Sequence, residues 1–374
     1  MPTTTVRGRI PGRPGLWEVT LDAGAVSSLA CVDAGYAEER CAWITPGLFD
    51  LQVNGIRGVD FADPGVTVAQ LAEADGLLRA KGVSRYLATI VTRDAAAIEA
   101  ILARFAEARQ QDAVPGAAGI HVEGPYISPE DGYRGVHQRR FVRDPDPAEL
   151  ERFQRTAGGF IRLVTIAPER PGAVDFIRAA VAMGIRVAMG HTAATVAETV
   201  LAADAGLTLC THIFNGCAQL VDRHANVLYA QLAEDRLWGC FIADGHHVPM
   251  PALRVGLRAK GWQRSILVSD VSRFSGLPDG TYEMERREVE KRGGGVFVKA
   301  SPLLSGAART LDEDVAILAR EHEPGIERCL LMAATHPAAA LGDPGWADLA
   351  AGRRGPLVVF SWDGRDLAPR HLAG

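Results

Sequence analysis

The chain has 374 residues, of which 47% are hydrophobic and 23% are charged, with a formal net charge of −5 and a sequence pI near 6.1. This length suits one large domain with an accessory layer, or two ordinary domains. The slightly acidic balance argues against a surface for nucleic acid or for an anionic membrane. No run of about 18 apolar residues occurs, so we expect no membrane-spanning segment.

The cysteines and the N-terminus indicate a compartment. The six cysteines are scattered without a C-x-x-C pair, which is typical of reduced, buried small side chains rather than of a disulfide or thiolate-metal framework. The first residues, MPTTTVR, contain no apolar signal core. We therefore expect a cytoplasmic protein that acts on a small molecule.

Short apolar runs alternate with alanine-rich segments of helical period through the middle of the chain, for example at 67–82, 94–111 and 172–184. Such alternation predicts βαβ units and a parallel sheet. Eight repeats fit a closed (β/α)₈ barrel. The alternative, a doubly wound sheet, would favour a G-x-G-x-x-G turn after its first strand, and QVNGIRG (52–58) is not one. The predicted strands are 42–53, 84–91, 118–122, 161–167, 185–189, 207–211, 238–243 and 264–269.

The two ends of the chain have a different pattern. Residues 1–45 are rich in Thr, Val and Gly and read as short hairpin strands, and the tail is similar. We expect residues 1–45 and 346–374 to form a small β-sandwich domain beside a barrel of residues 46–345. The charged, Gly-rich stretch 285–297 predicts an exposed hairpin.

Polar residues follow the predicted strands where the strands end. In a barrel, these positions all lie at the carboxyl-terminal mouth, where active sites are built. Each of them alone is more often a satisfied polar residue at a strand end. Several together, on successive strands, favour one site instead. They are Gln52 and Asn54, Glu123, His191, His212, His246 and His247, and Asp270.

Glu123, His191 and His212 offer one carboxylate and two imidazoles, which is a ligand set for catalytic Zn²⁺ or Fe²⁺ with a position left for water. A buried ionised carboxylate is costly unless it meets a positive partner. A metal ion would be that partner for Glu123, which ends a predicted buried strand.

The chain also resembles a known family. Seven motifs occur in the same order as in N-acetylglucosamine-6-phosphate deacetylases of the amidohydrolase superfamily, and the resemblance runs from about residue 46 to the C-terminus. It implies that Glu123, His191 and His212 bind one divalent metal, Zn²⁺ first, with Fe²⁺, Co²⁺ or Mn²⁺ as alternatives. The motifs are PGLFDLQVNG (46–55), GIHVEGPYISPEDGYRGVH (119–137), GHTAAT (190–195), THIFNG (211–216), ADGHHV (243–248), LVSD (267–270) and SGAARTLDEDV (305–315).

Many amidohydrolases begin with His-x-His and bind two metals. Here that position reads Gln52-Val53-Asn54, which looks like the mononuclear deacetylases, with Gln52 holding a water rather than the metal. By the same resemblance, Asp270 takes the proton of the attacking water and passes it to the leaving amine. His137, in the family's G-x-H, would help to stabilise the oxyanion.

The resemblance also suggests how substrate binds. His247 and the backbone of Asn215 and Gly216 would face the sugar or its phosphate. Arg223 matches an arginine that reaches a phosphate across a dimer interface in the family, which implies a homodimer. The expected reaction is removal of the acetyl group from an N-acetylated amino-sugar phosphate, in amino-sugar metabolism.

Departures from the family pattern leave the substrate open. The chain reads FNGCAQLVDRHANV (214–227) and VSRFSGLPDG (271–280) where the family differs, and it carries Tyr133 and Arg134 near the mouth. An unphosphorylated amino sugar or an N-acyl amino acid is therefore the alternative substrate, with Arg273 as the candidate for binding a carboxylate. A third interpretation is a barrel without catalytic activity. The presence of the three candidate metal ligands and of Asp270 argues against it, because such a relative would be expected to lose some of them.

Overall fold

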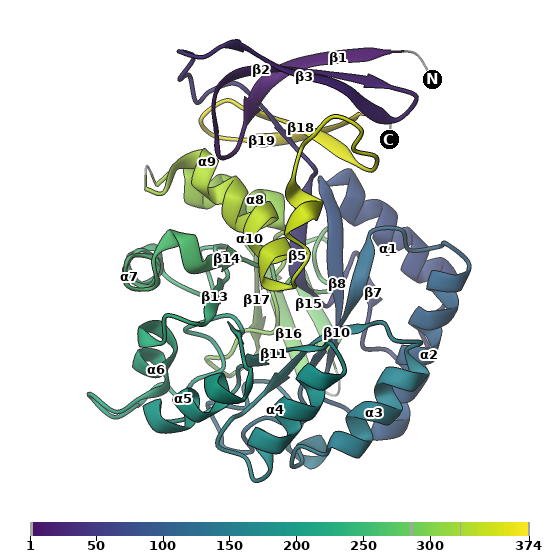
Figure 1. Ribbon diagram of the computed structural model, residues 1–374. Helices are drawn as coiled ribbons and strands as arrows, with labels where there is room; N and C mark the ends of the chain where they lie inside the picture. The colour runs from purple at the N-terminus through teal and green to yellow at the C-terminus, as the bar shows by residue number, and fades with distance from the viewer. Residues whose placement is uncertain (1–2, 285–286, 322, 373–374) are drawn as a thin grey trace.

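The computed structural model describes residues 3–284, 287–321 and 323–372, and it confirms the predicted barrel (Figure 1). Eight parallel strands pair in chain order, and a bridge between Val53 and Val271 closes the barrel. There the backbone N–H of Asn54 donates to the backbone carbonyl of Val271 at 2.7 Å. The strands are β5 (Leu48–Val53), β8 (Val83–Val91), β9 (Ala117–Glu123), β10 (Ile161–Ile166), β11 (Arg186–Met189), β12 (Leu209–Cys210), β13 (Trp238–Phe241) and β14 (Ser265–Leu267).

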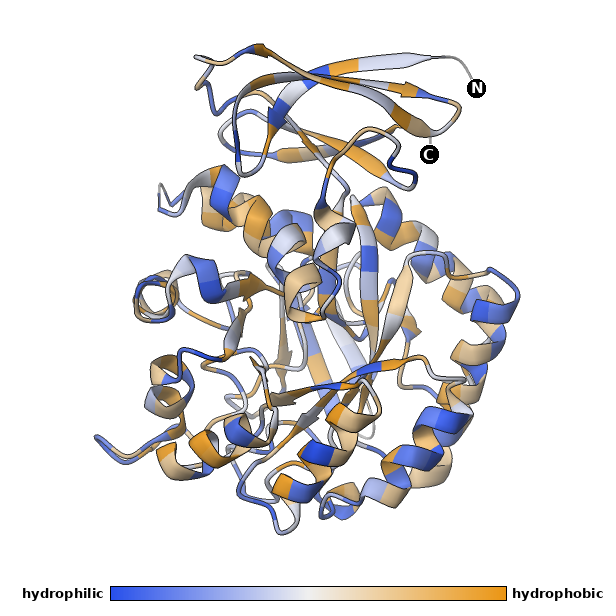
Figure 2. Cartoon of the chain, viewed as in Figure 1, coloured by the Kyte–Doolittle hydropathy of each residue, from blue (hydrophilic) through white to orange (hydrophobic). Residues whose placement is uncertain are grey.

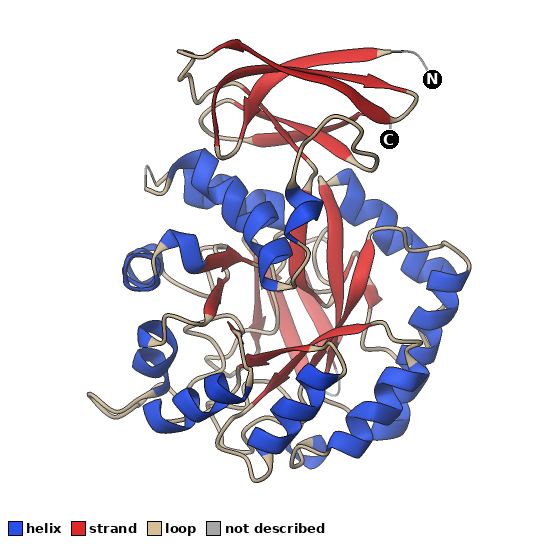
Figure 3. Ribbon diagram, viewed as in Figure 1, coloured by secondary structure: helices blue, strands red, loops and turns tan. Residues whose placement is uncertain are grey.

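Helices surround the barrel (Figure 3). Some of them start at side-chain caps, as at Thr67 and Thr195, each of which forms a capping box with the residue three positions on. The helices carry hydrophobic and hydrophilic residues side by side, as amphipathic helices do (Figure 2). They are α1 (Val68–Ala80), α2 (Ala95–Gln110), α3 (Pro147–Thr156), α4 (Ala173–Ala182), α5 (Val196–Ala205), α6 (Val227–Ala233), α7 (Met250–Lys260), α8 (Leu311–Ala319), α9 (Gly325–Leu330) and α10 (His336–Ala340).

Short helical segments complete the ring. A π-helical stretch, Leu331–Thr335, joins α9 to α10, and 3₁₀ turns occur at Arg139–Phe141, Trp262–Arg264 and Pro344–Ala347. No helix of the described residues is long and apolar enough to cross a membrane.

The two ends of the chain meet in a small β-sandwich beside the barrel (Figure 1). Its six strands form one hydrogen-bonded sheet, whose two halves are joined by the pairing of Arg9 with Trp43. A core that includes Val19, Ile44 and Leu357 lies between the two halves. The division into domains at residues 45 and 346 stays a prediction. One layer holds β1 (Thr4–Ile10), β2 (Arg13–Asp22) and β3 (Ala25–Asp33), and the other holds β4 (Ala42–Thr45), β18 (Leu357–Trp362) and β19 (Leu367–Leu372).

The first predicted strand, 42–53, is two strands. Its first half is β4 of the sandwich and its second half is β5 of the barrel, with Pro46 and Gly47 between them. Gly47 has φ 95°, and a Cβ there would lie 1.9 Å from the Ser84 hydroxyl, so only glycine fits the turn. The apolar run therefore contains the point at which the chain passes from one sheet to the other.

A three-stranded antiparallel sheet lies near the barrel mouth: β15 (Gly280–Met284), β16 (Arg287–Arg292) and β17 (Gly295–Val298). The predicted hairpin 285–297 falls on β16 and β17, although residues 285–286 lie outside the described part. Its apolar side is not exposed, because Val289 and Val296 are fully buried against Phe274. A smaller hairpin, β6 (Gly55–Ile56) and β7 (Val59–Asp60), follows β5.

Candidate active site

The carboxyl ends of the strands surround a pocket of about 370 Å³. Ten residues are given a role in metal binding, catalysis or substrate binding from the sequence, and eight of these line the pocket while two do not. Gln52 is buried and contacts two of the eight, whereas Arg223 is exposed on the loop before α6. The eight are Glu123, His137, His191, His212, Asn215, Gly216, His247 and Asp270.

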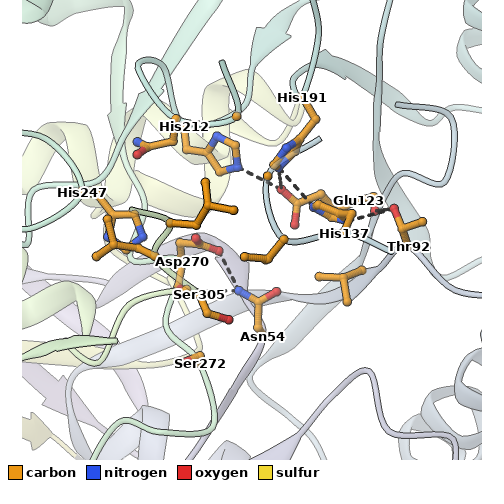
Figure 4. A pocket seen from close by; sticks show the side chains of 18 of the residues that line it. Asn54, Thr92, Glu123, His137, His191, His212, His247, Asp270, Ser272 and Ser305 are labelled. Carbon is orange, nitrogen blue, oxygen red and sulfur yellow. Dashed lines mark hydrogen bonds and ion pairs between the residues drawn. The ribbon is translucent and has the colours of Figure 1, made fainter. Parts of the chain in front are cut away.

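Glu123, His191 and His212 form a buried cluster whose candidate ligand atoms lie within 4.8 Å of one another (Figure 4). The Nε2 atoms of His212 and His191 lie 3.1 and 3.4 Å from Glu123 Oε1. Burial raises the pKa of Glu123, but the hydrogen bonds from the two histidines outweigh it and hold that pKa well below its usual range. The carboxylate is therefore ionised and facing two imidazoles.

The surroundings of His191 suit a metal ligand. His191 Nδ1 lies 2.9 Å from the carbonyl of Tyr133, and a carbonyl only accepts, so Nδ1 carries a hydrogen and Nε2, which faces Glu123, is the nitrogen that would coordinate a metal. His212 Nδ1 is buried and has no hydrogen-bond partner among the described residues. One carboxylate and two imidazoles with this arrangement fit a divalent ion with coordination positions left open.

The backbone is strained at three of these residues. His191, His212 and Asp270 have φ values of 50°, 25° and 52°, in a region that residues other than glycine rarely occupy. Each such conformation costs on the order of 1–3 kcal/mol and persists only where surrounding structure holds it. The strain lies at the strand ends where the polar side chains converge.

Two amide side chains hold Asp270. Gln52 Nε2 lies 3.0 Å from both Glu123 Oε1 and Asp270 Oδ1. Asn54 Nδ2 donates to the same Asp270 oxygen at 2.7 Å, as Figure 4 shows. Burial and the neighbouring charge of Glu123 raise the pKa of Asp270. The two amides fix where this carboxylate sits relative to the histidine cluster.

His137 lies beside the cluster, with its Nε2 atom 3.2 Å from His191 Nε2. Its Nδ1 atom is 2.9 Å from the hydroxyl of Thr92, which follows β8. Burial and then His191 lower the pKa of His137 to about 3, so the ring is neutral at physiological pH. Sequence reasoning missed Thr92, although a polar residue directly after a buried strand is the signal that identified the other site residues.

Asp244 was also missed. Its Oδ2 atom lies 2.7 Å from His247 Nδ1, and its Oδ1 atom accepts the backbone N–H groups of His246 and His247 at 2.8 Å. Burial raises the pKa of Asp244, but the hydrogen bond from His247 outweighs it and lowers that pKa. An aspartate two residues before a turn histidine is a sequence signal for such a loop.

Arg273 lines the pocket but is engaged. Its guanidinium lies 3.6 Å from Asp60 Oδ2 and donates to the Glu283 carbonyl at 2.7 Å. Tyr133 and Arg134 also differ from the family pattern. Tyr133 supplies the backbone carbonyl that accepts from His191, and Arg134 pairs with Asp131.

Comparisons with known proteins identify relatives of the chain, although no protein-family model matches it. It is 33% identical to N-acetylgalactosamine-6-phosphate deacetylase of Escherichia coli O157:H7, over 90% of this chain and 88% of the relative. It is 34% identical to N-acetylglucosamine-6-phosphate deacetylase of Vibrio furnissii, over 86% and 79%. The crystal structure of N-acetyl-D-glucosamine-6-phosphate deacetylase from Mycobacterium smegmatis superposes with a TM-score of 0.87, 29% identity, and coverage of 100% and 98%.

A (β/α)₈ barrel with a small β-sandwich, and with one carboxylate, two imidazoles and an aspartate at its mouth, defines an enzyme of the amidohydrolase superfamily. The chain belongs to the N-acetylglucosamine-6-phosphate deacetylase family within it.

Proposed function

We propose that this protein is a metal-dependent hydrolase that removes the acetyl group from N-acetylglucosamine 6-phosphate or a close analogue. The products are the amino-sugar phosphate and acetate. One observation carries the proposal. Glu123, His191, His212 and Asp270 come together in one pocket, in a chain whose relatives are named for this deacetylation.

Glu123, His191 and His212 would hold one divalent ion, with Zn²⁺ proposed first and Fe²⁺, Co²⁺ or Mn²⁺ as alternatives. Such an ion lowers the pKa of a bound water towards about 7 and polarises the amide carbonyl. The fit rests on the donor set and on the His191 Nδ1 contact with Tyr133, which leaves Nε2 for coordination.

Asp270 would act as the general base and then as the general acid. Gln52 and Asn54 both donate to Oδ1, which keeps Oδ2 for the proton of the attacking water. The water oxygen bonds to the carbonyl carbon, and Asp270 returns the proton to the amide nitrogen. Protonation lets the C–N bond break, so the nitrogen leaves as an amine and the acyl carbon leaves as acetate.

His137 would stabilise the developing charge on the carbonyl oxygen. A neutral ring can donate from Nε2 only if Nδ1 accepts. The Thr92 hydroxyl has one hydrogen and lies 2.9 Å from Nδ1 and 3.2 Å from the carbonyl of Glu123, and we propose that it donates over the shorter contact, to Nδ1. Thr92 would therefore select the tautomer in which His137 is a donor.

His247 and the backbone of Asn215 and Gly216 line the pocket and would bind the sugar or its phosphate. Arg223 is exposed and does not line the pocket of its own chain, which fits a role in the pocket of a second copy. Leu220 and Tyr229, 93% and 52% exposed on either side of Arg223, would lie in the interface of that homodimer. The cytoplasmic location expected from the cysteines stays a prediction.

The sugar epimer is the finer question, because one relative is named for N-acetylgalactosamine 6-phosphate and another for N-acetylglucosamine 6-phosphate. An N-acyl amino acid has less support, since Arg273 is already engaged by Asp60 and Glu283. An unphosphorylated amino sugar remains the alternative.

The test is acetate release by the zinc-loaded enzyme from the two phosphorylated epimers and from unphosphorylated N-acetylglucosamine. We expect fast turnover of at least one phosphorylated sugar and a much lower kcat/KM for the unphosphorylated one. If zinc is bound and none of these sugars is hydrolysed, the proposed substrate is wrong. Other N-acyl compounds would then be tested as substrates of the same site.

A further inference from the structure

Two side chains outside the pocket are arranged around the strained residues in the same way. Asp50 lies on β5, and Glu169 follows β10. Each binds a hydroxyl residue directly next in sequence to a strained site residue: Ser269 before Asp270, and Thr192 after His191. Neither carboxylate lines the pocket, so neither can touch substrate.

The Asp50 contacts pin the turn that carries Asp270. Ser269 donates its hydroxyl to Asp50 Oδ2 and its backbone N–H to Oδ1, the latter at 3.2 Å. The Ser269 hydroxyl oxygen in turn accepts the N–H of Val271 at 3.1 Å. The residues on both sides of Asp270 are thus fixed to β5, at the barrel seam where an isolated bridge joins Val53 to Val271.

The Glu169 contacts repeat this pattern beside His191. Thr192 donates its hydroxyl to Glu169 Oε2, and the backbone N–H of Ala193 donates to Oε1 at 2.8 Å. The Thr192 hydroxyl oxygen accepts the N–H of Ala194 at 3.0 Å. In both places one carboxylate binds a hydroxyl and a backbone N–H, and the hydroxyl closes onto the N–H two residues further on.

The third strained residue supplies a contrast. His212 follows Thr211, whose hydroxyl lies 2.7 Å from that of Thr165 rather than from a carboxylate. Carboxylates accept stronger hydrogen bonds than neutral oxygens. A carboxyl group takes the place of the neutral oxygen at the turn of the proposed base and at the turn of one proposed ligand, and burial raises the pKa of both carboxyls, that of Asp50 to about 7.

We infer that Asp50 and Glu169 are positioning residues: Asp50 acts through Ser269 to aim the carboxylate of Asp270, and Glu169 acts through Thr192 to aim the imidazole of His191. This inference rests on the proposed function for the roles of Asp270 and His191. It predicts that the two carboxylates control different quantities, catalysis for the first and metal affinity for the second.

The test compares Asp50→Asn and Ser269→Ala with Glu169→Gln and Thr192→Ala. Zinc affinity is measured by competition with a chromophoric chelator, and kcat by acetate release from N-acetylglucosamine 6-phosphate at saturating zinc. We expect the first pair to lower kcat at least about tenfold with zinc affinity kept within about twofold. The second pair should weaken zinc binding about 10- to 100-fold, with kcat recovered when zinc saturates.

Controls separate positioning from loss of fold. Thr192→Ser keeps the hydroxyl and should restore zinc affinity, and the double variant Asp50→Asn/Ser269→Ala should be no worse than either single variant. Exposed Asp175→Asn and Glu151→Gln should change neither quantity. If Asp50→Asn does not fold, Ser269→Ala alone tests whether Asp50 positions Asp270.

Two results would overturn the inference: Ser269→Ala with unchanged kcat, or all four variants weakening zinc and kcat in the same proportion. Failure of the proposed function looks different, because wild-type protein would then release no acetate. In that case the zinc measurements alone decide, and unchanged affinity in Glu169→Gln and Thr192→Ala overturns the inference.

Discussion

At the scale of single residues, the site consists of polar groups that are each costly to bury alone. Their hydrogen bonds and opposite charges offset that cost when they are buried together. Glu123 ends a buried strand and is ionised because His191 and His212 face it. The same reasoning identified it from the sequence, because a buried carboxylate needs a positive partner. The roles of Asp50 and Glu169 could not be found that way, since they depend on hydrogen bonds to residues far away in the sequence.

Replacing Asp270 tests the proposed general base. Asp270→Asn keeps the size and loses the base, so kcat should fall about 10²- to 10⁴-fold. Zinc content, measured by atomic absorption, should stay at the wild-type value, because Asp270 is outside the proposed ligand set. Asp279→Asn, at an exposed aspartate, is the matched control. A variant with more than a tenth of wild-type kcat would exclude Asp270 as the base.

Thr92 tests the tautomer of His137. Thr92→Val removes the hydroxyl that lies 2.9 Å from Nδ1, so nothing fixes the hydrogen on Nε2. We expect kcat to fall roughly tenfold with unchanged zinc affinity, and Thr92→Ser to behave as wild type. Steady-state kinetics with the chelator competition check this. Full activity in Thr92→Val would show that His137 does not depend on Thr92.

At the scale of elements, apolar runs and their spacing were sufficient to predict all eight barrel strands. They did not separate β4 from β5, because both halves of 42–53 are apolar and only Pro46-Gly47 marks the passage between sheets. They also made the hairpin at β16 and β17 look exposed, since charged residues alternate there with Val289, which packs inward. The spacing of apolar residues alone does not show whether a face of a strand is covered by another part of the protein.

Helix α8 carries a buried acid that the site does not use. Both carboxylate oxygens of Asp314 are buried without a partner among the described residues. Burial, then repulsion by Asp244 and Asp50, raise the pKa of Asp314 well above its usual value. The folded chain therefore binds this proton more tightly than the unfolded chain, and stability is lost as the pH rises from about 4 towards the folded pKa.

Asp314→Asn should remove that loss. We expect it to raise the free energy of unfolding by on the order of 1–3 kcal/mol at pH 8, with a smaller gain at pH 5. Urea unfolding at both pH values measures this. Asp235→Asn, at an exposed position, should change stability by less than about 0.5 kcal/mol. A gain that is the same at both pH values would contradict the account.

At the scale of the whole molecule, the barrel supplies one mouth, and the sandwich formed by the two ends of the chain lies away from it (Figure 1). The sequence indicated this arrangement through its strand pattern and through the polar residues at the strand ends. It could not indicate whether the pocket is complete in one chain. Arg223, exposed in the single chain, makes that question testable.

Complementation tests the proposed dimer. Arg223→Ala should raise KM for the phosphorylated sugar and leave the unphosphorylated sugar unaffected, because only a phosphate would meet the guanidinium. When Arg223→Ala and Asp270→Asn chains are unfolded, mixed equally and refolded, about half of the dimers are mixed and each has one complete site. At substrate concentrations well below KM, activity should then recover to about a quarter of wild type, well above either variant alone. No recovery would place Arg223 outside the partner's site.

The central claim is that one metal ion, held by Glu123, His191 and His212, supports amide hydrolysis with Asp270. The most direct measurement is acetate release from N-acetylglucosamine 6-phosphate as zinc is titrated into metal-stripped protein. We predict a linear rise from near zero to a plateau at one equivalent of zinc per chain. A plateau at two equivalents would contradict the single-metal site, and zinc binding without acetate release would contradict the deacetylase.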